Sequence, residues 1–550
     1  MNNLNRHLPT VDPSHFAMVP KSDVPRSTFA TTHTVKTTFD VDYLIPIEVS
    51  EVLPGDHTQA EVTIFARVAN LIFPLMDNLT VETFFFFVPN RLVWDNWQKF
   101  MGEQTNPGDS IAFTIPQLVS PAGGFLVGGL ADQMGLPTVG QLTAGQTVSV
   151  NALPFRAYNL IFNQWFRDQN LMASVPVPKT DGPDSIASYN REKRCKKHDY
   201  FTSCLPWPVK GGQSVSLPLA GQANVLTNPT ALLSGVHNPV IFATAASGGF
   251  PIANTAAFGS GVNSGYIGAN SVATAMSAGA AVYPTNLYAD LSSTTGTTIN
   301  AMRLAVATQQ FLEKDARGGT RYTELLKNHF GVTPEDARLQ RPEYIGGGRT
   351  PIQTNAMPQT SPQIANGTPL GSLAGQGVLA TSHKYEYHAT EHGYIIGLIN
   401  VTGDVTYQQG LHKQWTRKTR FDFYWPTFAH LGEQAVLSGE LYSTGVPATD
   451  DAVFGYQERH AEYRYRPSSI RGLFKSTSAL NIDDWHLAEQ FPPGLPPQLN
   501  ATFIRQNTPM SRVLAAGIDA AGLQIQMDSV FNIRCTRPLP TYAVPGLDRF

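Results

Sequence analysis

The sequence predicts a mainly β protein, a sandwich of sheets whose connections are much longer than the strands they join. Three observations support this prediction. Alternating apolar residues mark strands near the start of the chain, and strand patterns return towards its end. The 46 glycines and 40 prolines exceed average usage and indicate many turns and irregular connections. Helical patterns are few and lie between the two groups of strands, which is typical of a β-sandwich with enlarged loops.

The first strand signal is an alternation over residues 35–49. Most odd positions are apolar and most even ones are polar, so one extended strand is expected with its apolar set on one face. A turn follows at Pro54-Gly55-Asp56, and the alternation resumes over residues 62–68. The run VETFFFFV at 81–88 is almost continuously apolar, which predicts a strand covered on both faces.

Four helices are predicted after this first group of strands. Trp94 and Trp97 stand at helical spacing in the segment 90–102, with Asn90 as the expected N-cap and Gly102 at the end. The other three helices are expected over residues 155–166, 300–314 and 320–331.

Strand patterns return in the later part of the chain. They combine β-branched and aromatic residues with alternating polar ones, and the last of them lies close to the C-terminus. These strands are expected at residues 384–387, 394–401, 420–425, 462–466 and 529–535.

The composition changes between residues 211 and 302. Asp290 is the single charged side chain there, amid Gly, Ala, Ser, Thr and Asn, whereas a disordered linker is normally charged or strongly polar. Long connections inside a domain are usually functional or disordered. Aromatic side chains are numerous enough to pack a small excursion, so an ordered surface projection is expected. The aromatic residues are Phe242, Phe250, Phe258, Tyr266, Tyr283 and Tyr288.

Charge and cysteine content exclude several classes of protein. The net charge of −3 provides no global field towards nucleic acid or membranes, so any nucleic-acid contact must be local. The three cysteines have no metal-ligand spacing and are expected to be reduced thiols in a protein assembled inside a cell. The start of the sequence has no apolar core of a signal peptide, and no apolar run approaches the roughly 18 residues of a membrane span. A soluble chain made in the cytosol is expected.

The strongest catalytic string is His388-x-x-Glu391-His392. On a helix the two histidines would stand one turn apart and could share a zinc ion, with the glutamate as base. Here the flanking residues are strand-like, and four residues of extended chain span roughly 13 Å, far beyond two metal bonds of about 2 Å. A solvated or interface loop is therefore the preferred interpretation.

A second glycine-rich string, Gly346-Gly347-Gly348-Arg349, could in principle cradle a phosphate. It lacks the Lys-Ser/Thr of a nucleotide-binding loop, so a flexible turn is expected instead. No nucleophile–base pair is evident elsewhere. The sequence therefore predicts a protein that is not an enzyme, with no catalytic residue, metal or cofactor.

Two basic clusters with aromatic neighbours are candidate contacts for single-stranded DNA. Such DNA is held by cations along its backbone and by aromatic faces that stack on bases. The alternative is that both clusters are solvated faces, or partners of acidic residues across a subunit interface. The first cluster contains Arg191, Lys193, Arg194, Lys196 and Lys197; the second contains Lys413, Trp415, Arg417, Lys418 and Arg420.

Seven segments, taken together and in order, resemble the major capsid proteins of microviruses, small icosahedral phages with single-stranded DNA, and specifically their gokushovirus branch. Singly each segment is a weak signal, but they cover nearly the whole chain. The matching segments are FAMVPKSDVPRSTF, FFFFVPNRLVWDNWQKFMGE, LPFRAYNLIFNQWFRDQNL, KKHDYFTSCLPWPVKGG, RYTELLKNHFGV, RPEYIGGG and VPGLDRF.

The resemblance implies an eight-stranded viral jelly roll, a fold that periodicity alone does not determine. Residues 1–550 would form a single capsid domain with an N-terminal arm over about residues 1–32 and a protruding insertion at residues 211–300. About sixty copies would assemble into a T=1 shell around a circular single-stranded DNA genome. A small basic viral protein would neutralise the DNA, a host receptor would meet the insertion, and the virion would assemble in the host cytoplasm without membrane insertion.

Two other classes of function remain as alternatives. Jelly rolls also occur in carbohydrate-binding and glycan-cleaving proteins, which would need carboxylates beside exposed aromatic residues in a groove, and the sequence offers no clear carboxylate pair. A non-viral surface or fibre protein would be expected to carry a signal peptide or a short repeat. The capsid interpretation accounts for more of the chain than either.

Overall fold

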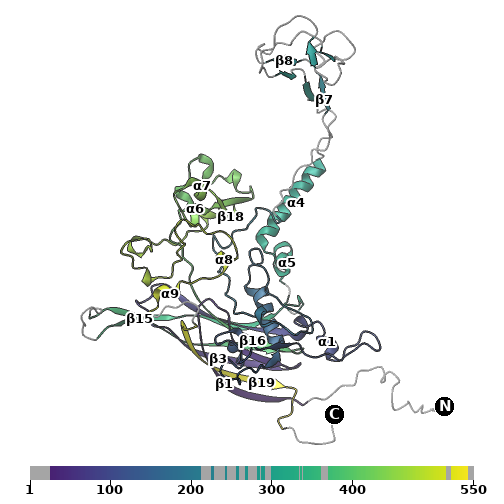
Figure 1. The fold of residues 1–550 in the computed structure, drawn as a ribbon, viewed down its shortest axis with the longest axis vertical. Coiled ribbons are helices and arrows are strands. Elements are labelled where there is room, and N and C mark those ends of the chain that lie inside the picture. Colours follow the sequence, from purple (N-terminus) through teal and green to yellow (C-terminus); the bar gives the residue numbers. More distant parts are fainter. Residues whose placement is uncertain are drawn as a thin grey trace, which may run out of the picture. The chain divides into compact units, whose positions relative to one another are not determined.

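A computed structural model provides the fold (Figure 1). Contacts divide the chain into two compact units, residues 1–210 with 315–550 and residues 211–314. The structure describes residues 25–211, 224–227, 242–244, 256–258, 267–269, 282–284, 287–290, 299–333, 335–336, 338–360, 370–515 and 522–542.

In its described residues, the larger unit is built on eight long strands, and every neighbouring pair is antiparallel. The first four, in spatial order, are β1 (Ser27–Phe39), β19 (Ile525–Arg537), β3 (His57–Val68) and β15 (Leu373–His388). The next four, in spatial order, are β13 (Glu343–Pro351), β4 (Leu79–Pro89), β16 (Gly393–Gly403) and β2 (Ile45–Val52).

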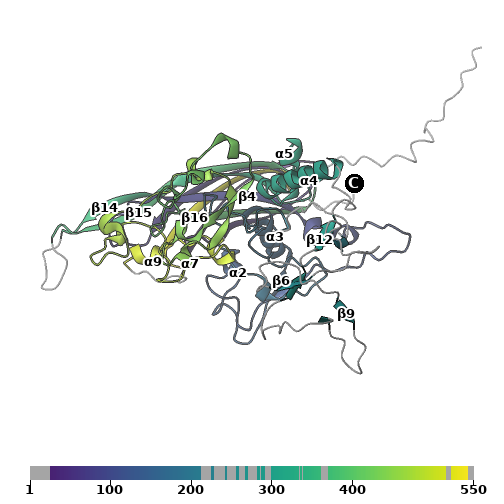
Figure 2. The ribbon, with the colours of Figure 1, turned by 90° about the horizontal axis from the view of Figure 1, so that it is seen from above.

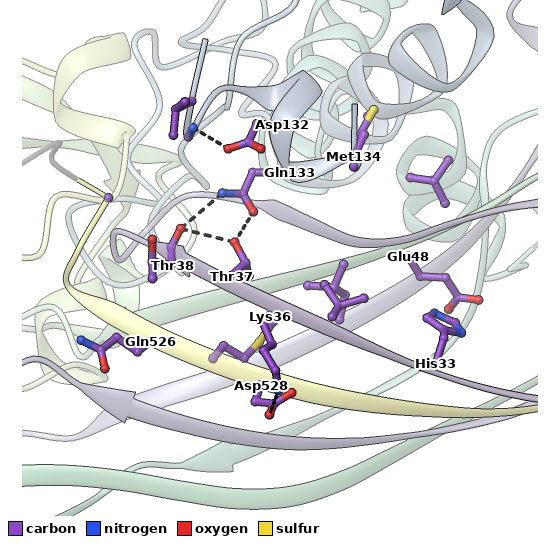
Figure 3. A pocket seen from close by; sticks show the side chains of 18 of the residues that line it. His33, Lys36, Thr37, Thr38, Glu48, Asp132, Gln133, Met134, Gln526 and Asp528 are labelled. Atoms are coloured by element: carbon purple, nitrogen blue, oxygen red, sulfur yellow. Dashed lines mark hydrogen bonds and ion pairs between the residues drawn. The ribbon is translucent and has the colours of Figure 1, made fainter. Parts of the chain in front are cut away.

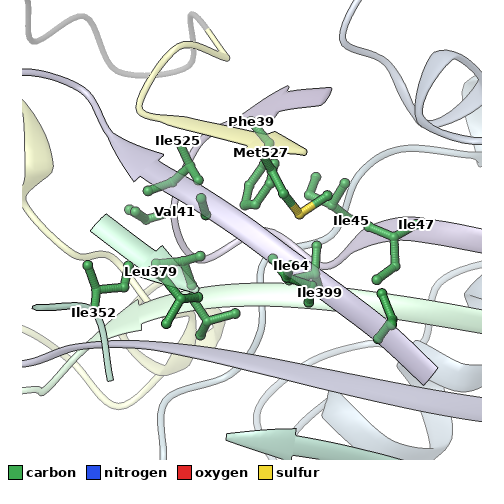
Figure 4. Close-up of a cluster of buried hydrophobic side chains, with 14 of the residues drawn as sticks. Phe39, Val41, Ile45, Ile47, Ile64, Ile352, Leu379, Ile399, Ile525 and Met527 are labelled. Carbon is green, nitrogen blue, oxygen red and sulfur yellow. The ribbon is translucent and has the colours of Figure 1, made fainter. Parts of the chain in front are cut away.

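Among the eight long strands, the two groups meet at one register pair, Gly346 with Tyr385, so they form two four-stranded sheets rather than one continuous surface. A short ninth strand, β14 (Gln353–Pro358), follows β13 and pairs with β15. A buried cluster of aliphatic and aromatic side chains fills the space between them (Figure 4). Ile64 and Met527 reach it from one sheet and Ile399 from the other. Two face-to-face sheets of four antiparallel strands, with most sequence neighbours placed on opposite sheets, confirm the predicted jelly roll.

The alternation over residues 62–68 is confirmed. Val62, Ile64, Ala66 and Val68 are buried, and the side chains between them on β3 face away from the core. The outer face of this sheet is polar, with cross-strand pairs such as Thr32 to Asn532 at 3.0 Å. One face of the sheet thus packs on the core while the other is suited to contact with water.

The apolar run on β4 is buried on both faces, as predicted. Phe85 and Phe87 point into the core between the sheets, whereas Phe86 and Val88 point into a second core on the opposite face. Helix α3 (Leu153–Ile161), which continues as a π-helical turn over Phe162–Phe166, covers that opposite face. Figure 2 shows α3 beside β4 and β16. The long connection after β4 therefore folds back to cover the sheet.

The prediction of one strand over residues 35–49 is wrong. The chain turns between β1 and β2 at Asp42, which has a φ of 71°. The carboxylate of Asp42 accepts hydrogen bonds from the amide (2.6 Å) and hydroxyl (2.7 Å) of Thr508. This partner lies 466 residues away in the sequence. The local alternation of apolar and polar residues therefore does not reveal the turn, which depends on a contact that forms only in the folded chain.

The helix expected over residues 90–102 is also broken. It consists of a 3₁₀ turn at Asn90–Leu92 and one α-helical turn, α1 (Trp97–Phe100), and Asn90 makes no side-chain cap. The amide of Asp95 donates to the carbonyl of Lys179 at 3.1 Å instead of to the preceding turn. This long-range bond interrupts the helical ladder, although Gly102 ends the segment as expected, with a φ of 104°.

Two predicted strands are wrong for a different reason. Residues 420–425 and 462–466 form 3₁₀ turns, at Arg420–Asp422 and Ala461–Tyr463. The carboxylate of Asp422 accepts the amides of Lys418 and Thr419 at 2.8 and 2.7 Å, which closes a turn. The aromatic residues that suggested a strand lie outside any sheet.

The flexible turn expected at Gly346-Gly347-Gly348 is wrong, because these glycines lie inside β13. Gly347 has a φ of 151°, and a Cβ atom there would stand 2.1 Å from the carbonyl oxygen of Thr83. A Cβ on Gly346 would meet Tyr385, and one on Gly348 would meet His383. The three glycines let β13 lie closely between β4 and the opposite sheet.

The remaining predictions for regular elements are confirmed. Helices α4 (Ile299–Gly318) and α5 (Tyr322–Phe330) are present, and Gly331 ends α5 with a φ of 71°. The strand patterns at 384–387, 394–401 and 529–535 lie in β15, β16 and β19. The three cysteines are unpaired.

Two long connections carry most of the residues outside the sandwich, at 90–342 between β4 and β13 and at 404–524 between β16 and β19. Because the strands alternate in direction, these connections leave from opposite ends of the sandwich. The minor elements in and beside them are β5 (Gln117–Val119), α2 (Leu130–Gln133), β6 (Ser149–Asn151), a 3₁₀ turn at Ile186–Ser188, β14 (Gln353–Pro358), 3₁₀ turns at Lys413–Trp415 and Pro426–Phe428, β17 (Glu433–Leu437), α6 (Ser438–Leu441), α7 (Pro447–Asp450), β18 (Val453–Glu458), 3₁₀ turns at Gly472–Phe474 and Asp483–Trp485, α8 (Ala501–Ile504) and α9 (Met510–Val513).

Within its described residues, the second unit contains three short antiparallel strand pairs, each nested inside the previous one along the chain. The described backbone thus returns on itself as a series of hairpin-like pairs. The outermost pair is β7 (Asn224–Thr227) with β12 (Leu287–Asp290), the middle pair is β8 (Phe242–Thr244) with β11 (Val282–Pro284), and the innermost pair is β9 (Ala256–Phe258) with β10 (Ile267–Ala269).

Candidate functional site

The first basic cluster lies where the two long connections touch. Residues around Lys196 run beside the segment at Arg505, with a bridge between Cys195 and Arg505 and a hydrogen bond from the Lys196 amide to the Ile504 carbonyl at 2.8 Å. The Lys196 ammonium is buried, lies 2.7 Å from the carboxylate of Glu489 and sits over the ring of Phe503 at 4.2 Å. Lys196 therefore links the connection at 90–342 to the connection at 404–524.

Arg194 and Lys197 of the same cluster converge on Glu82, the one charged residue in the apolar run of β4. Arg194 pairs directly with this carboxylate, Lys197 lies 2.9 Å from it and Arg349 lies 3.4 Å from it. Burial alone would raise the pKa of Glu82, but the charges and hydrogen bonds of Arg194 and Lys197 outweigh it and hold the pKa below its usual value. Three cations around one carboxylate leave a local positive excess.

The other two members of the first cluster, Arg191 and Lys193, share one aromatic ring. Their cationic groups lie 4.9 and 5.2 Å from the ring centroid of Tyr43, and Lys193 also donates to Asn507 at 3.2 Å. Both side chains are partly exposed. Within the first cluster, Arg191, Lys193 and Lys197 remain accessible to a ligand.

The second basic cluster is divided between buried and exposed groups. Lys413 lies 3.4 Å from Glu440, and Arg417 lies 3.1 Å from Glu462 with its guanidinium 4.3 Å from the ring centroid of Tyr463. The other members, Lys418, Arg420 and the Trp415 ring, are exposed. The cluster thus presents two cations and an aromatic ring to solvent.

The string His388-x-x-Glu391-His392 forms the turn between β15 and β16. The guanidinium of Arg91 donates two hydrogen bonds to the carboxylate of Glu391, of 2.7 and 3.0 Å. The ring of His392 packs against Trp97, with centroids 5.8 Å apart, while His388 faces His57 at 6.2 Å. The carboxylate of Glu391 is thus paired with Arg91. Among the described residues, no group of three potential ligands could hold a metal ion.

A cavity of about 1120 Å³ lies between β1 and β2, the two edge strands of the sandwich (Figure 3). Ser50 donates its hydroxyl to Glu48 at 3.0 Å, and His33 stacks on Phe531 at 5.0 Å. The Ser50 hydroxyl and the His33 ring thus have partners other than each other. Thr37 bonds Gln133 at 2.6 Å, which links the edge strand to α2 across the cavity wall.

Glu48 stands out on this cavity wall because its carboxylate is buried. It accepts hydrogen bonds from Tyr385 (2.7 Å) and Ser50, while its second oxygen has no hydrogen-bond partner among the described residues. Burial raises the pKa of Glu48 to about 7, against the lowering effect of the two hydrogen bonds. Another buried acid, Asp42, has a pKa raised by burial to about 6.

We expect Glu48→Gln to flatten the pH dependence of stability. The folded chain holds the Glu48 proton up to a pH of about 7, whereas the unfolded chain releases it near 4.5, so stability falls as the pH rises between these values. The full difference corresponds to about 3 kcal/mol. Urea unfolding at pH 4.5 and pH 8 should show the variant gaining relative to the unchanged chain only at the higher pH. Glu103→Gln, at an exposed position, is the control, and equal pH profiles for all three chains would contradict this prediction.

The candidate residues of the insertion are only partly within the described structure. Phe250 and Tyr266 lie outside the described residues, and Phe242, Phe258 and Tyr283 lie on strands whose backbone alone is described. Among the described residues no helix is long and apolar enough to cross a membrane.

Sequence reasoning missed the role of Glu82. Its signal was a single acidic residue inside the apolar run VETFFFFV, because a charge in a doubly covered strand needs a partner. It also missed the buried pair of Arg156 and Asp184, whose side chains are 0% and 2% exposed. No local pattern marks that pair, since its members come from a helix and a distant loop.

Comparison with known proteins identifies the family of the chain. The sequence matches the family described as capsid protein (F protein) over residues 17–547. It is 46% identical to capsid protein VP1 of Bdellovibrio phage phiMH2K over 96% of this chain and 97% of that protein. It is 39% identical to capsid protein VP1 of Chlamydia phage 1, with 99% of each chain covered, and 36% identical to that of Spiroplasma virus 4, with 97% of each covered. The chain therefore belongs to the capsid protein (F protein) family of the microviruses and is a structural protein of the virion.

Proposed function

We propose that the chain assembles with about sixty copies of itself into a closed T=1 icosahedral shell. One observation carries this proposal: a jelly-roll sandwich with two long connections that leave from its opposite ends. A closed shell needs several different contacts from one sequence, and connections at both ends of a scaffold supply them. The described side chains at the former catalytic candidates are engaged in structural contacts, which fits a protein without chemistry of its own.

We further propose that the shell encloses a circular single-stranded DNA genome with a small basic viral protein. The accessible cations of the first cluster, Arg191, Lys193 and Lys197, are the groups we assign to phosphate contact. Residues 211–300 are the part we assign to a host receptor, and assembly would take place in the host cytoplasm. The insertion residues with this proposed role are Phe242, Phe250, Phe258, Tyr266 and Tyr283.

Electron microscopy of the purified full chain tests the assembly. We expect uniform closed particles, or ring-shaped oligomers that convert to particles when the protein concentration is raised. When circular single-stranded DNA is present during assembly, a fraction of it should become resistant to nuclease. A chain that remains a homogeneous monomer across salt, pH and concentration would overturn the proposed shell.

A further inference from the structure

One surface of the larger unit exposes aromatic rings to an unusual degree. We define the aromatic strip as Trp415, Phe421, Phe423, Tyr424 and Trp425, which are 71%, 52%, 52%, 49% and 50% exposed. Scattered apolar residues on a surface are ordinary, but five large exposed rings within one short segment are typical of an interaction site. The strip belongs to the connection between β16 and β19, away from the sandwich core.

The strip is held in shape by its own hydrogen bonds. The indole of Trp425 donates to the carbonyl of Arg420 at 2.8 Å, and the amide of Tyr424 donates to the hydroxyl of Tyr463 at 3.2 Å. The turn at Asp422 is closed by two backbone amides. These bonds fix the backbone of the strip and the Trp425 ring, which lowers the conformational entropy that the strip would lose on binding a partner.

The charges of the strip favour a protein partner over nucleic acid. Arg417 is neutralised by Glu462 and stacked on Tyr463, and Lys413 is paired with Glu440. The second cluster has four cations, and only Lys418 and Arg420 remain exposed. Two cations are too few to bind successive phosphates along a nucleic-acid backbone. Aromatic residues together with arginine are the side chains enriched in the cores of protein interfaces.

The exposed area is on the scale of a specific contact. An aromatic side chain carries roughly 150–250 Å², so five rings at about half exposure present roughly 500 Å². A stable interface takes about 800 Å² from each partner. The strip alone would supply more than half of this area. Two further exposed residues extend it: Leu411, which lines a cavity with Trp415, and Tyr463, which accepts a hydrogen bond from the Tyr424 amide.

A cavity beside the strip contains a buried polar group that lacks a hydrogen bond. It has a volume of about 720 Å³, and its lining includes Trp415, Phe421 and His460. His460 is 6% exposed, and within the described chain neither ring nitrogen has a hydrogen-bond partner. The carboxylate of Glu462 lies 3.9 Å from its Nδ1, which is too far for a hydrogen bond. Such a group is costly unless something satisfies it, and a polar side chain entering the cavity would do so.

We propose that the aromatic strip is a contact surface for a second copy of this chain. The inference rests on the proposed shell, since each copy in a closed shell meets several others and can bury exposed apolar surface against them. The rings of one copy would be buried by its neighbour, and a polar side chain of the neighbour would reach His460. In a symmetric shell every copy makes the same contact. Removal of the rings would therefore weaken this contact throughout the particle.

The test compares two triple variants of the full chain. The strip variant is Trp415→Ser with Phe421→Ser and Phe423→Ser; the matched control replaces three exposed leucines elsewhere, Leu126→Ser with Leu480→Ser and Leu495→Ser, which are 75%, 78% and 67% exposed. We expect the strip variant to give at least a tenfold lower yield of particles, with an unchanged circular dichroism spectrum and thermal midpoint. The control should assemble normally. Trp415→Ser alone, at the most exposed ring of the strip, repeats the test if the triple variant fails to fold.

The outcomes separate the two proposals. Normal particle yield from the strip variant would overturn the strip contact, and normal yield with loss of nuclease-protected DNA would assign the strip to nucleic acid instead. If the unchanged chain forms no particles, the shell proposal fails. Sedimentation of the unchanged chain and of the strip variant then tests the strip contact by itself. Oligomers of the unchanged chain that are absent in the strip variant would support the contact, whereas two identical monomers would overturn it.

Discussion

Arg156→Met is expected to lower the free energy of unfolding by about 3–5 kcal/mol, because it leaves a buried carboxylate without its counter-ion. The guanidinium donates to the two oxygens of Asp184 at 2.8 and 2.6 Å and to the Val93 carbonyl at 3.1 Å. The Tyr189 hydroxyl also donates to Asp184. This network fixes α3 against the loop that follows it. Urea unfolding of the purified chain measures the loss.

The double variant Arg156→Met with Asp184→Asn separates charge from packing. The asparagine side chain would carry no charge while still offering an acceptor to Tyr189, so we expect the double variant to recover at least half of the loss. If the double variant is as unstable as Arg156→Met alone, the loss comes from packing around the methionine, and the explanation by an uncompensated charge is wrong.

Gly347→Ala is expected to be comparably severe. The residue has a φ of 151°, and a Cβ atom would lie 2.1 Å from the Thr83 carbonyl oxygen, which belongs to the backbone of β4 and cannot rotate away. The strained conformation and the collision each cost about 1–3 kcal/mol, so about 2–6 kcal/mol is expected in total. Thermal unfolding followed by circular dichroism measures the effect.

Gly102→Ala is the matched control for this variant. Gly102 also has a positive φ, of 104°, but no atom lies within 4 Å of the position that a Cβ would take. It should therefore show the conformational cost without the collision, about 1–2 kcal/mol. Equal losses at the two glycines would mean that β4 and β13 can separate enough to admit a methyl group.

The parts of the fold that the sequence predicts are those determined by neighbouring residues. The alternation on β3 and the doubly covered run on β4 follow directly from which side chains must avoid water. The breaks were missed because they depend on distant partners. Asp42 turns the chain towards Thr508, and Asp95 leaves its helix for Lys179.

The candidate sites show the same division. The sequence identifies where cations gather, but it does not identify their partners. Lys196 is paired with Glu489, 293 residues away, and Arg194 with Glu82. The first basic cluster is therefore partly neutralised in the fold, and only its accessible members can meet a ligand. The exposed aromatic residues at 421–425 favour a strand by composition, because composition alone does not distinguish a strand from a rigid exposed loop.

The bond between Lys196 and Glu489 joins the two long connections, and a small apolar core of Tyr200, Phe201 and Phe454 packs around the same junction. Residues that touch are coupled in their effect on stability, so a change on one side alters what is tolerated on the other. During evolution the two connections should therefore vary in step, although strands of the sandwich separate them in the sequence. A chimera that exchanges only one of them with a relative would separate co-adapted residues, whereas exchange of both would keep them together.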